Sequence, residues 1–121
     1  MGIFGEVSKQ VEEDRKKAEE KLLNNRIRAD KYISNVSQHL ARSIKASLAA
    51  NLKNTKSVTY NLDLSKILQV DRTITLQEYE ELVMENEDFE NFLEDLEDNG
   101  FEYTLKFEKR VYKLSLTIEK E

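Results

Sequence analysis

Hydrophobic and polar residues follow a helical period in the second half of the chain, from residue 75 to residue 99. Apolar side chains recur there every three or four positions, as on the buried face of an amphipathic helix. They are Tyr79, Leu82, Val83, Phe89, Leu93 and Leu96. Thr75 is a favourable N-cap with Glu78 three residues later, which completes a capping box. Asn99-Gly100 supplies the left-handed position that ends a helix, so we expect one capped helix over residues 75–99.

After Gly100 the period changes to two, which is typical of half-buried strands. Apolar and polar residues alternate over 101–108 and again over 112–118, on either side of a turn at Lys109-Arg110. The same alternation over residues 58–64 predicts a third strand. Residues 65–74 fit either a helical turn or an extended segment. Leu93 and Leu105 are expected to face each other where the helix packs on the sheet.

The first fifty residues contain no strong helix breaker and carry one long apolar stripe. Its residues recur at intervals of eleven, in two series. The series are Val7, Ala18, Ala29 and Leu40, and Val11, Leu22, Ile33 and Ile44. An eleven-residue repeat has 3.67 residues per turn, so the stripe stays on nearly one face of a straight helix. This favours one continuous helix from residue 6 to about residue 53 over two helices broken at Asn24-Asn25.

The length of this helix predicts how the chain is divided. About 45 helical residues span roughly 70 Å, whereas a domain of this size has a radius of gyration of about 14 Å. The stripe is thin before residue 28 and denser after it. We therefore expect residues 1–27 to form a helical arm that projects or mediates dimerisation, and residues 28–121 to form a single domain.

The order of these elements predicts an α+β fold. One apolar face on each strand indicates a three-stranded sheet that helices cover on one side and that solvent reaches on the other. A right-handed crossover from the first strand could place it beside the last strand, in a split arrangement.

Charge is divided between the two parts of the chain, although the net charge is only −5. Residues 1–72 hold 14 basic and 9 acidic side chains, whereas residues 73–121 hold 5 and 15. Between residues 26 and 56 there are seven basic residues and one acid, and between residues 78 and 102 there are twelve acids and no base. Such asymmetry often marks an interaction surface.

Residue patterns of catalytic, metal and membrane-bound proteins are not found in the sequence. Without cysteine the chain has no thiolate ligand or nucleophile, and its composition suits a cytoplasmic protein. His39 is the one histidine, and no carboxylate or oxyanion hole is placed to act with it. The acids lack EF-hand spacing, and three glycines are too few for a phosphate loop. No apolar run reaches the roughly 20 residues of a membrane span, and no secretory signal precedes the first helix. We therefore expect no enzyme, no cofactor, no metal and no membrane association.

The acidic helix is the expected partner-binding element, since it keeps many like charges without an interleaved base. Like charges at i,i+4 weaken a helix by a few tenths of a kcal/mol per pair, and a basic partner would relieve that repulsion. The acids assigned to the partner-binding face are Glu80, Glu81, Glu87, Asp88, Glu94, Asp95 and Asp98. The basic tract is expected to contact nucleic acid or an acidic partner, including this helix itself. Its candidate residues are Arg26, Arg28, Lys31, Arg42 and Lys45.

These patterns predict a small non-enzymatic protein-interaction protein whose acidic helix occupies a basic surface of a partner, with a regulatory role that includes inhibition. Homo-oligomers, homodimers first, are also expected. One alternative is a nucleic-acid-associated protein that uses the basic tract 26–56. The sequence pI near 5.1 argues against nucleic-acid binding. Another is a structural oligomer assembled through the long N-terminal helix. The size and charge polarity suit an accessory protein of a phage or mobile element.

Overall fold

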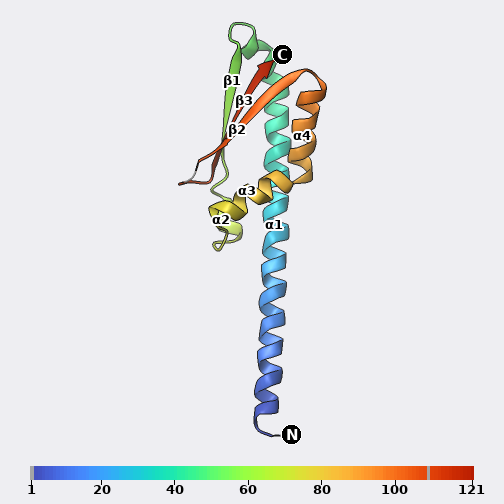
Figure 1. Ribbon diagram of the computed structural model, residues 1–121, viewed down its shortest axis with the longest axis vertical. Coiled ribbons are helices and arrows are strands. Elements are labelled where there is room, and N and C mark those ends of the chain that lie inside the picture. Colours follow the sequence, from blue (N-terminus) through green and yellow to red (C-terminus); the bar gives the residue numbers. More distant parts are fainter. Residues whose placement is uncertain (1, 109) are drawn as a thin grey trace.

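The computed structural model describes residues 2–108 and 110–121 and has an α+β fold. Its elements follow the order helix, strand, three helices and two strands (Figure 1). They are α1 (Phe4–Leu52), β1 (Ser57–Asp63), α2 (Ile67–Val70), α3 (Leu76–Glu85), α4 (Glu87–Asp98), β2 (Phe101–Phe107) and β3 (Lys113–Lys120). The turn expected at Lys109-Arg110 includes Lys109, which lies outside the described residues.

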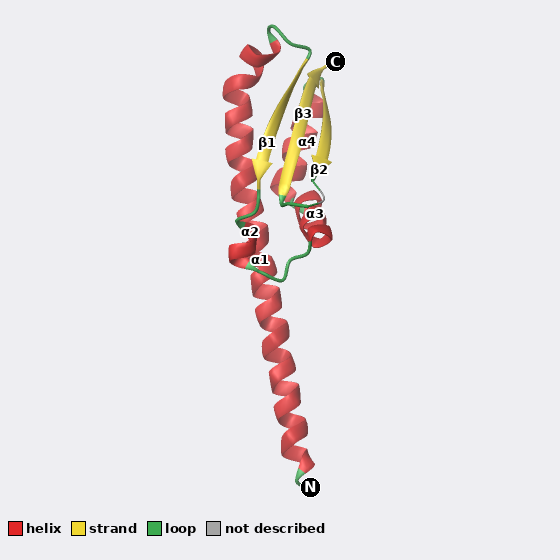
Figure 2. Ribbon diagram, turned by 90° about the vertical axis from the view of Figure 1, so that its left-hand side faces the viewer, coloured by secondary structure: helices red, strands yellow, loops and turns green. Residues whose placement is uncertain are grey.

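The three strands form one antiparallel sheet in the order β1-β3-β2, so the first strand lies beside the last one, as expected. Helices α1 and α4 lie behind one face of this sheet (Figure 2). Leu114, Leu116 and Ile118 of the central strand are almost fully buried on that face. The opposite face is polar: the Thr59 and Thr117 hydroxyls lie 2.9 Å apart there, in neighbouring strands.

Helix α1 is continuous for 49 residues and passes through Asn24-Asn25 without a break. Its buried positions all lie in the second half and repeat the eleven-residue spacing of the stripe. They are Ala29, Ile33, Ser37, Leu40, Ile44 and Leu48. The first half extends beyond the rest of the fold (Figure 1). The remaining elements and residues 26–52 of α1 are called the body here.

The helix expected over residues 75–99 is in fact two helices, and Asn86 separates them. Asn86 is 1% exposed and has an extended backbone, with φ −67° and ψ 125°. Its side-chain oxygen accepts a hydrogen bond from the Phe89 N–H at 2.9 Å, which begins α4. Its side-chain nitrogen donates to the carbonyl and carboxylate of Asp30 and to the Ser34 hydroxyl on α1. These contacts to α1 hold Asn86 out of a helical conformation.

Helix α3 begins at the expected residue but with half of the expected capping box. The Thr75 hydroxyl accepts a hydrogen bond from the Glu78 N–H at 3.2 Å. The Glu78 carboxylate is instead directed to Arg26 on α1. At the other end, Gly100 has φ 81° and ends α4 as expected. The uncertain stretch 65–74 contains the single helical turn α2.

Candidate protein-interaction surface

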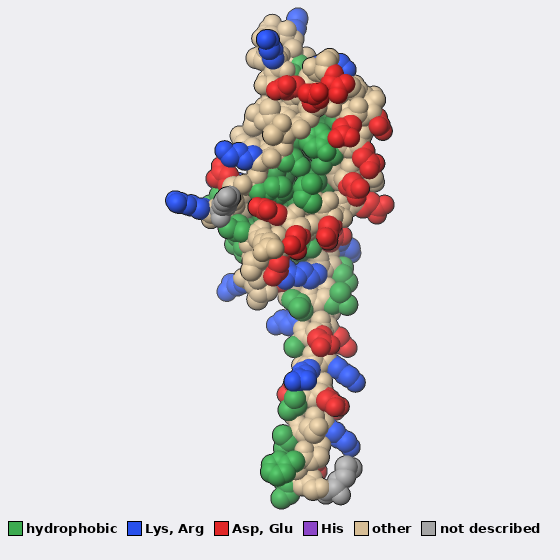
Figure 3. All heavy atoms as spheres, viewed as in Figure 1, with side chains coloured by type: hydrophobic (Ala, Val, Ile, Leu, Met, Phe, Trp, Pro, Cys, Tyr) green, Lys and Arg blue, Asp and Glu red, His purple; other side chains and the backbone are tan. Residues whose placement is uncertain are grey.

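The acids of α3 and α4 lie outside the core because the apolar residues of both helices face inward. Tyr79 and Val83 of α3 and Phe89, Leu93 and Leu96 of α4 are buried. The remaining faces carry the acids that the sequence assigns to partner binding. Of these, Glu81, Glu87, Glu94, Asp95 and Asp98 are exposed, and Glu80 and Asp88 are half-buried. Acidic side chains gather along the edge formed by α4 and continue across α3 (Figure 3).

The break at Asn86 divides the expected acidic surface into two parts. Glu80 and Glu81 belong to α3, and the other five belong to α4. On α4, Glu87 and Glu94 are seven residues apart, as are Asp88 and Asp95, so they recur on one side of the helix. The acidic residues of α4 therefore form a compact ridge on a single helix. Glu80 and Glu81 flank it.

The basic residues of α1 are mostly exposed as well. Arg28, Lys31, Arg42 and Lys45 are exposed, and Arg26 is half-buried. They lie on one helix, with the two pairs separated by three turns. Arg42 and Lys45 lie beside α4, while Arg28 and Lys31 lie near the beginning of the body.

A shallow groove of about 510 Å³ runs between α1 and α4 and ends at β2. Its walls combine apolar side chains with charged ones of both signs. The apolar residues are Ala41, Ile44, Leu48, Phe92, Leu96 and Phe101, and the polar ones are Arg42, Lys45, Asp95 and Asn99. Sequence reasoning missed this groove because its three segments are far apart in the chain. The one local signal is Phe92, an aromatic residue next to the main stripe of α4 that remains half-buried.

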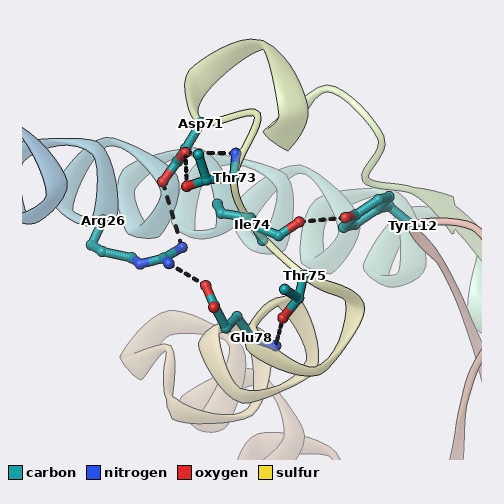
Figure 4. Close-up of polar contacts among 7 residues, drawn as sticks. All are labelled: Arg26, Asp71, Thr73, Ile74, Thr75, Glu78 and Tyr112. Atoms are coloured by element: carbon teal, nitrogen blue, oxygen red, sulfur yellow. Dashed lines mark hydrogen bonds and ion pairs between the residues drawn. The ribbon is translucent and has the colours of Figure 1, made fainter.

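Arg26 joins the basic tract to the acidic segment at the lower end of the body (Figure 4). It lies between two carboxylates, those of Glu78 on α3 and of Asp71 in the loop after α2. The distance from its Nη1 atom to Asp71 Oδ2 is 3.6 Å. Ile74 lies in the same loop, and its carbonyl accepts a hydrogen bond from the hydroxyl of Tyr112, the residue before β3, which fixes the loop against the sheet.

These two ion pairs, both made by Arg26, are the ones formed within the described part of the chain. The expected pairing between the basic tract and the acidic helix is thus seen at Glu78, which is not among the assigned partner-binding acids. Within the described residues, the seven assigned acids form no ion pair. Asp88 has one weak side-chain contact, to the Gln38 amide at 3.5 Å.

Asp71 is buried and ionised, and its environment makes a pH-dependent contribution to stability. The hydroxyl of Thr73, at 2.6 Å, and its N–H, at 2.9 Å, donate to one carboxylate oxygen. The Thr73 hydroxyl is the largest influence, and with the Thr73 N–H and the Arg26 charge it holds the pKa of Asp71 below its usual value, although burial acts in the opposite direction. The lowered pKa means that the folded protein favours the charged form of this residue.

We expect the free energy of unfolding to fall as the pH drops through about 4 and below, and Asp71→Asn to reduce that dependence. With the folded-state pKa below the unfolded value of about 3.9, the unfolded chain binds the proton first. The stabilisation is therefore complete at neutral pH and lost in acid. Urea denaturation of both proteins at pH 7 and pH 3.5 measures the difference. Thr73→Val removes the hydroxyl donor and should reduce the pH dependence of the unfolding free energy in part. If wild type and Asp71→Asn lose the same unfolding free energy between pH 7 and pH 3.5, Asp71 is not the source of the pH dependence.

His39 is exposed on α1. Among residues 2–108 and 110–121, no cluster of histidine, aspartate or glutamate side chains is arranged to hold a metal ion. Within the same residues, no helix combines the length and hydrophobicity of a membrane span.

Comparisons with known proteins give no lead to function. No family model, no curated protein and no solved structure matches the chain.

Proposed function

We propose that the protein is a small non-enzymatic interaction protein whose acidic α4 ridge, flanked by α3, binds a basic surface of a partner protein. The observation that carries this proposal is that the seven assigned acids form no ion pair within the described part of the chain. Their mutual repulsion is relieved when a basic surface approaches, and a single-sign patch also speeds association. By covering a basic surface, the protein would exclude other acidic ligands from it, which is a regulatory and inhibitory action.

The groove beside the ridge supplies the apolar contact that charge alone lacks. Asp95 belongs to both the acidic ridge and the groove wall, so the two features are continuous. Protein interfaces draw most of their binding energy from a few anchors in desolvated pockets, while rim charges mainly set the rate and specificity. The partner surface that fits best therefore combines lysines or arginines with one apolar side chain that enters the groove.

Reversing the charge of the ridge tests the proposal. The quadruple variant Glu87→Lys, Asp88→Lys, Glu94→Lys and Asp95→Lys should remove binding to a lysine-rich peptide that carries one leucine or phenylalanine, measured by fluorescence anisotropy at low salt. Because the changed residues lie outside the core, circular dichroism should show an unchanged fold.

A matched control changes four acids elsewhere. Glu102, Glu108, Glu119 and Glu121 are exposed and lie on β2, on β3 or directly after them. Their replacement by lysine alters the net charge by the same amount as the α4 variant. If net charge alone governs binding, both quadruple variants should weaken it equally, whereas the proposal expects a larger loss for the α4 variant. If the α4 variant is folded and binds as well as wild type, the ridge is ordinary solvated surface and the proposal is wrong.

Nucleic-acid binding is the second candidate, favoured by the exposure of Arg28, Lys31, Arg42 and Lys45. In that case binding to a DNA or RNA duplex should fall steeply as salt rises, since phosphate contacts release counterions. Replacing Arg42 and Lys45 by glutamine should weaken this binding, whereas the α4 reversal should strengthen it. The opposite response of the α4 variant separates the two candidate functions.

A further inference from the structure

The arm, defined as residues 3–25, has an apolar stripe that nothing in the described chain covers. Ile3 and Phe4 are 86% and 81% exposed, and Val7, Val11 and Leu22 are about half exposed. Hydrophobic side chains recur along the arm beneath the body (Figure 3). Most helical stability in proteins comes from packing an apolar face, and the arm leaves its apolar face unpacked. The arm therefore has both the surface and the energetic need for a partner.

The stripe of the arm is the direct continuation of the stripe that the body buries. Val7 and Ala18 are 22 and 11 residues before Ala29, and Val11 and Leu22 stand in the same relation to Ile33. Because an eleven-residue repeat stays on nearly one face of a straight helix, the exposed residues face the side of α1 on which the body lies. Whatever packs on the arm stripe thus lies directly below the body.

We propose that the arm of a second copy of this chain packs there, antiparallel to the first, and makes a two-fold homodimer. In a parallel pair each helix would have to run through the space that the other copy's body occupies. In an antiparallel pair the two bodies lie at opposite ends and leave the arms free to pack. The contact is self-complementary, as a two-fold dimer requires.

Three independent features place the two-fold axis between Asp14 and Arg15. The first is length: the helical part of the arm runs from residue 4 to residue 25, so its midpoint lies between residues 14 and 15, and Arg26 is already ion-paired to the body. The overlap is then about 35 Å long. In this register the N-terminus of each arm reaches the lower edge of the other body, and the arms cover the stripe from Val7 to Leu22.

The second feature is the apolar pattern of the arm. With the axis between residues 14 and 15, position i of one arm lies level with position 29−i of the other. Val7 is then level with Leu22, and Val11 with Ala18. Each of these four stripe residues therefore meets an apolar residue of the other copy.

The third feature is charge, which changes sign at the same place. The acidic block Glu12-Glu13-Asp14 is followed directly by the basic block Arg15-Lys16-Lys17. In the antiparallel register each acidic block lies level with the basic block of the other copy, and Lys9 lies level with Glu20. A parallel pair would place like blocks at the same height, where they repel.

Sedimentation equilibrium of the full-length chain tests the dimer. We expect the wild type to have the mass of a dimer and Leu22→Glu to raise the dissociation constant at least about 100-fold, because the new charge would be buried without a partner. Ile27→Glu is the matched control. Ile27 is similarly exposed, at 51% against 48%, but lies on the opposite side of α1 and beyond the overlap. A wild-type chain that is monomeric at every concentration, or equal effects of the two variants, would overturn the proposal.

Cross-linking tests the orientation and register, and the absence of native cysteine makes it clean. A mixture of the Val11→Cys and Ala18→Cys proteins, treated with a short thiol-reactive cross-linker, should give the mixed dimer. Val11→Cys alone should not cross-link to itself, since the two copies of residue 11 are about 10 Å apart along the axis at 1.5 Å per residue. Efficient self-linking by Val11→Cys would show a parallel pair and refute the antiparallel register. Neither measurement depends on the acidic α4 ridge, so this proposal and the proposed function can fail separately.

Discussion

Leu116→Ala is expected to lower the free energy of unfolding by about 2–5 kcal/mol, the range for emptying a well-packed leucine site. Leu116 is fully buried at the centre of β3, between Tyr60 of β1 and Leu105 of β2. A cavity there removes contacts to both neighbouring strands and to the helices behind the sheet. Urea denaturation monitored by circular dichroism measures the loss. A change below about 1 kcal/mol, as at surface sites, would mean that the sheet packs with another register or face.

Leu105→Ala is the matched control for this prediction. Leu105 is paired with Leu116 in the sheet but lies on the edge strand β2 and is only half-buried. The same atoms are removed from a site that solvent already reaches, so the expected loss is about half as large.

Asn86→Ala is expected to destabilise the protein by about 1.5–5 kcal/mol through two separate losses. The N-cap of α4 loses its acceptor, which costs about 0.5–2 kcal/mol. The contacts from the Asn86 amide to Asp30 and Ser34 are lost as well, and buried groups left without a partner cost about 1–3 kcal/mol. Thermal or urea denaturation measures the sum.

Two further variants separate the N-cap of α4 from the contacts that Asn86 makes with Asp30 and Ser34 on α1. Asn86→Asp keeps the acceptor for the Phe89 N–H but directs a second carboxylate at Asp30, so we expect it to be no more stable than Asn86→Ala. Asn99→Ala changes another asparagine at a helix boundary, but an exposed one, and should cost less than about 1 kcal/mol. If Asn86→Asp is as stable as wild type, the contacts of Asn86 with Asp30 and Ser34 contribute little to the stability of the fold.

Local periodicity predicts most of this fold because each element has a distinct apolar pattern. Alternation predicted all three strands, and the eleven-residue repeat favoured one continuous helix for α1 over two. The position of β1 beside β3 is the split arrangement that a right-handed crossover could give. These features depend on interactions within an element or between neighbouring ones.

The break at Asn86 was not predicted because its cause lies 52 to 56 residues away in sequence, at Ser34 and Asp30. One local signal was present, since an asparagine followed by Glu87-Asp88 is a typical helix start. The apolar stripe continues through this point and indicates a single helix. The contacts from Asn86 to Asp30 and Ser34 decide between a helix start at this residue and a single continuous helix.

The candidate surface was predicted only as far as charge can be read along the chain. The acids of α4 form a ridge because their spacing matches a helical face. The groove between α1 and α4 and the Arg26 junction each combine segments far apart in sequence. Only the packing of those segments brings Asp95 beside Arg42 and Lys45, or Arg26 between Asp71 and Glu78.

The central position of β3 has a consequence for biosynthesis. Both β1 and β2 pair with β3 and not with each other, and Thr59 is 58 residues ahead of its partner Thr117. While a ribosome makes the chain, α1 can form from local contacts, but both other strands emerge before the strand that joins them. Until residues 113–120 leave the exit tunnel, the β1 and β2 segments have no strand to pair with, and such unpaired segments are sites for aggregation and chaperone binding. A chain whose translation stops before residue 113 would have no sheet at all and should be degraded rapidly.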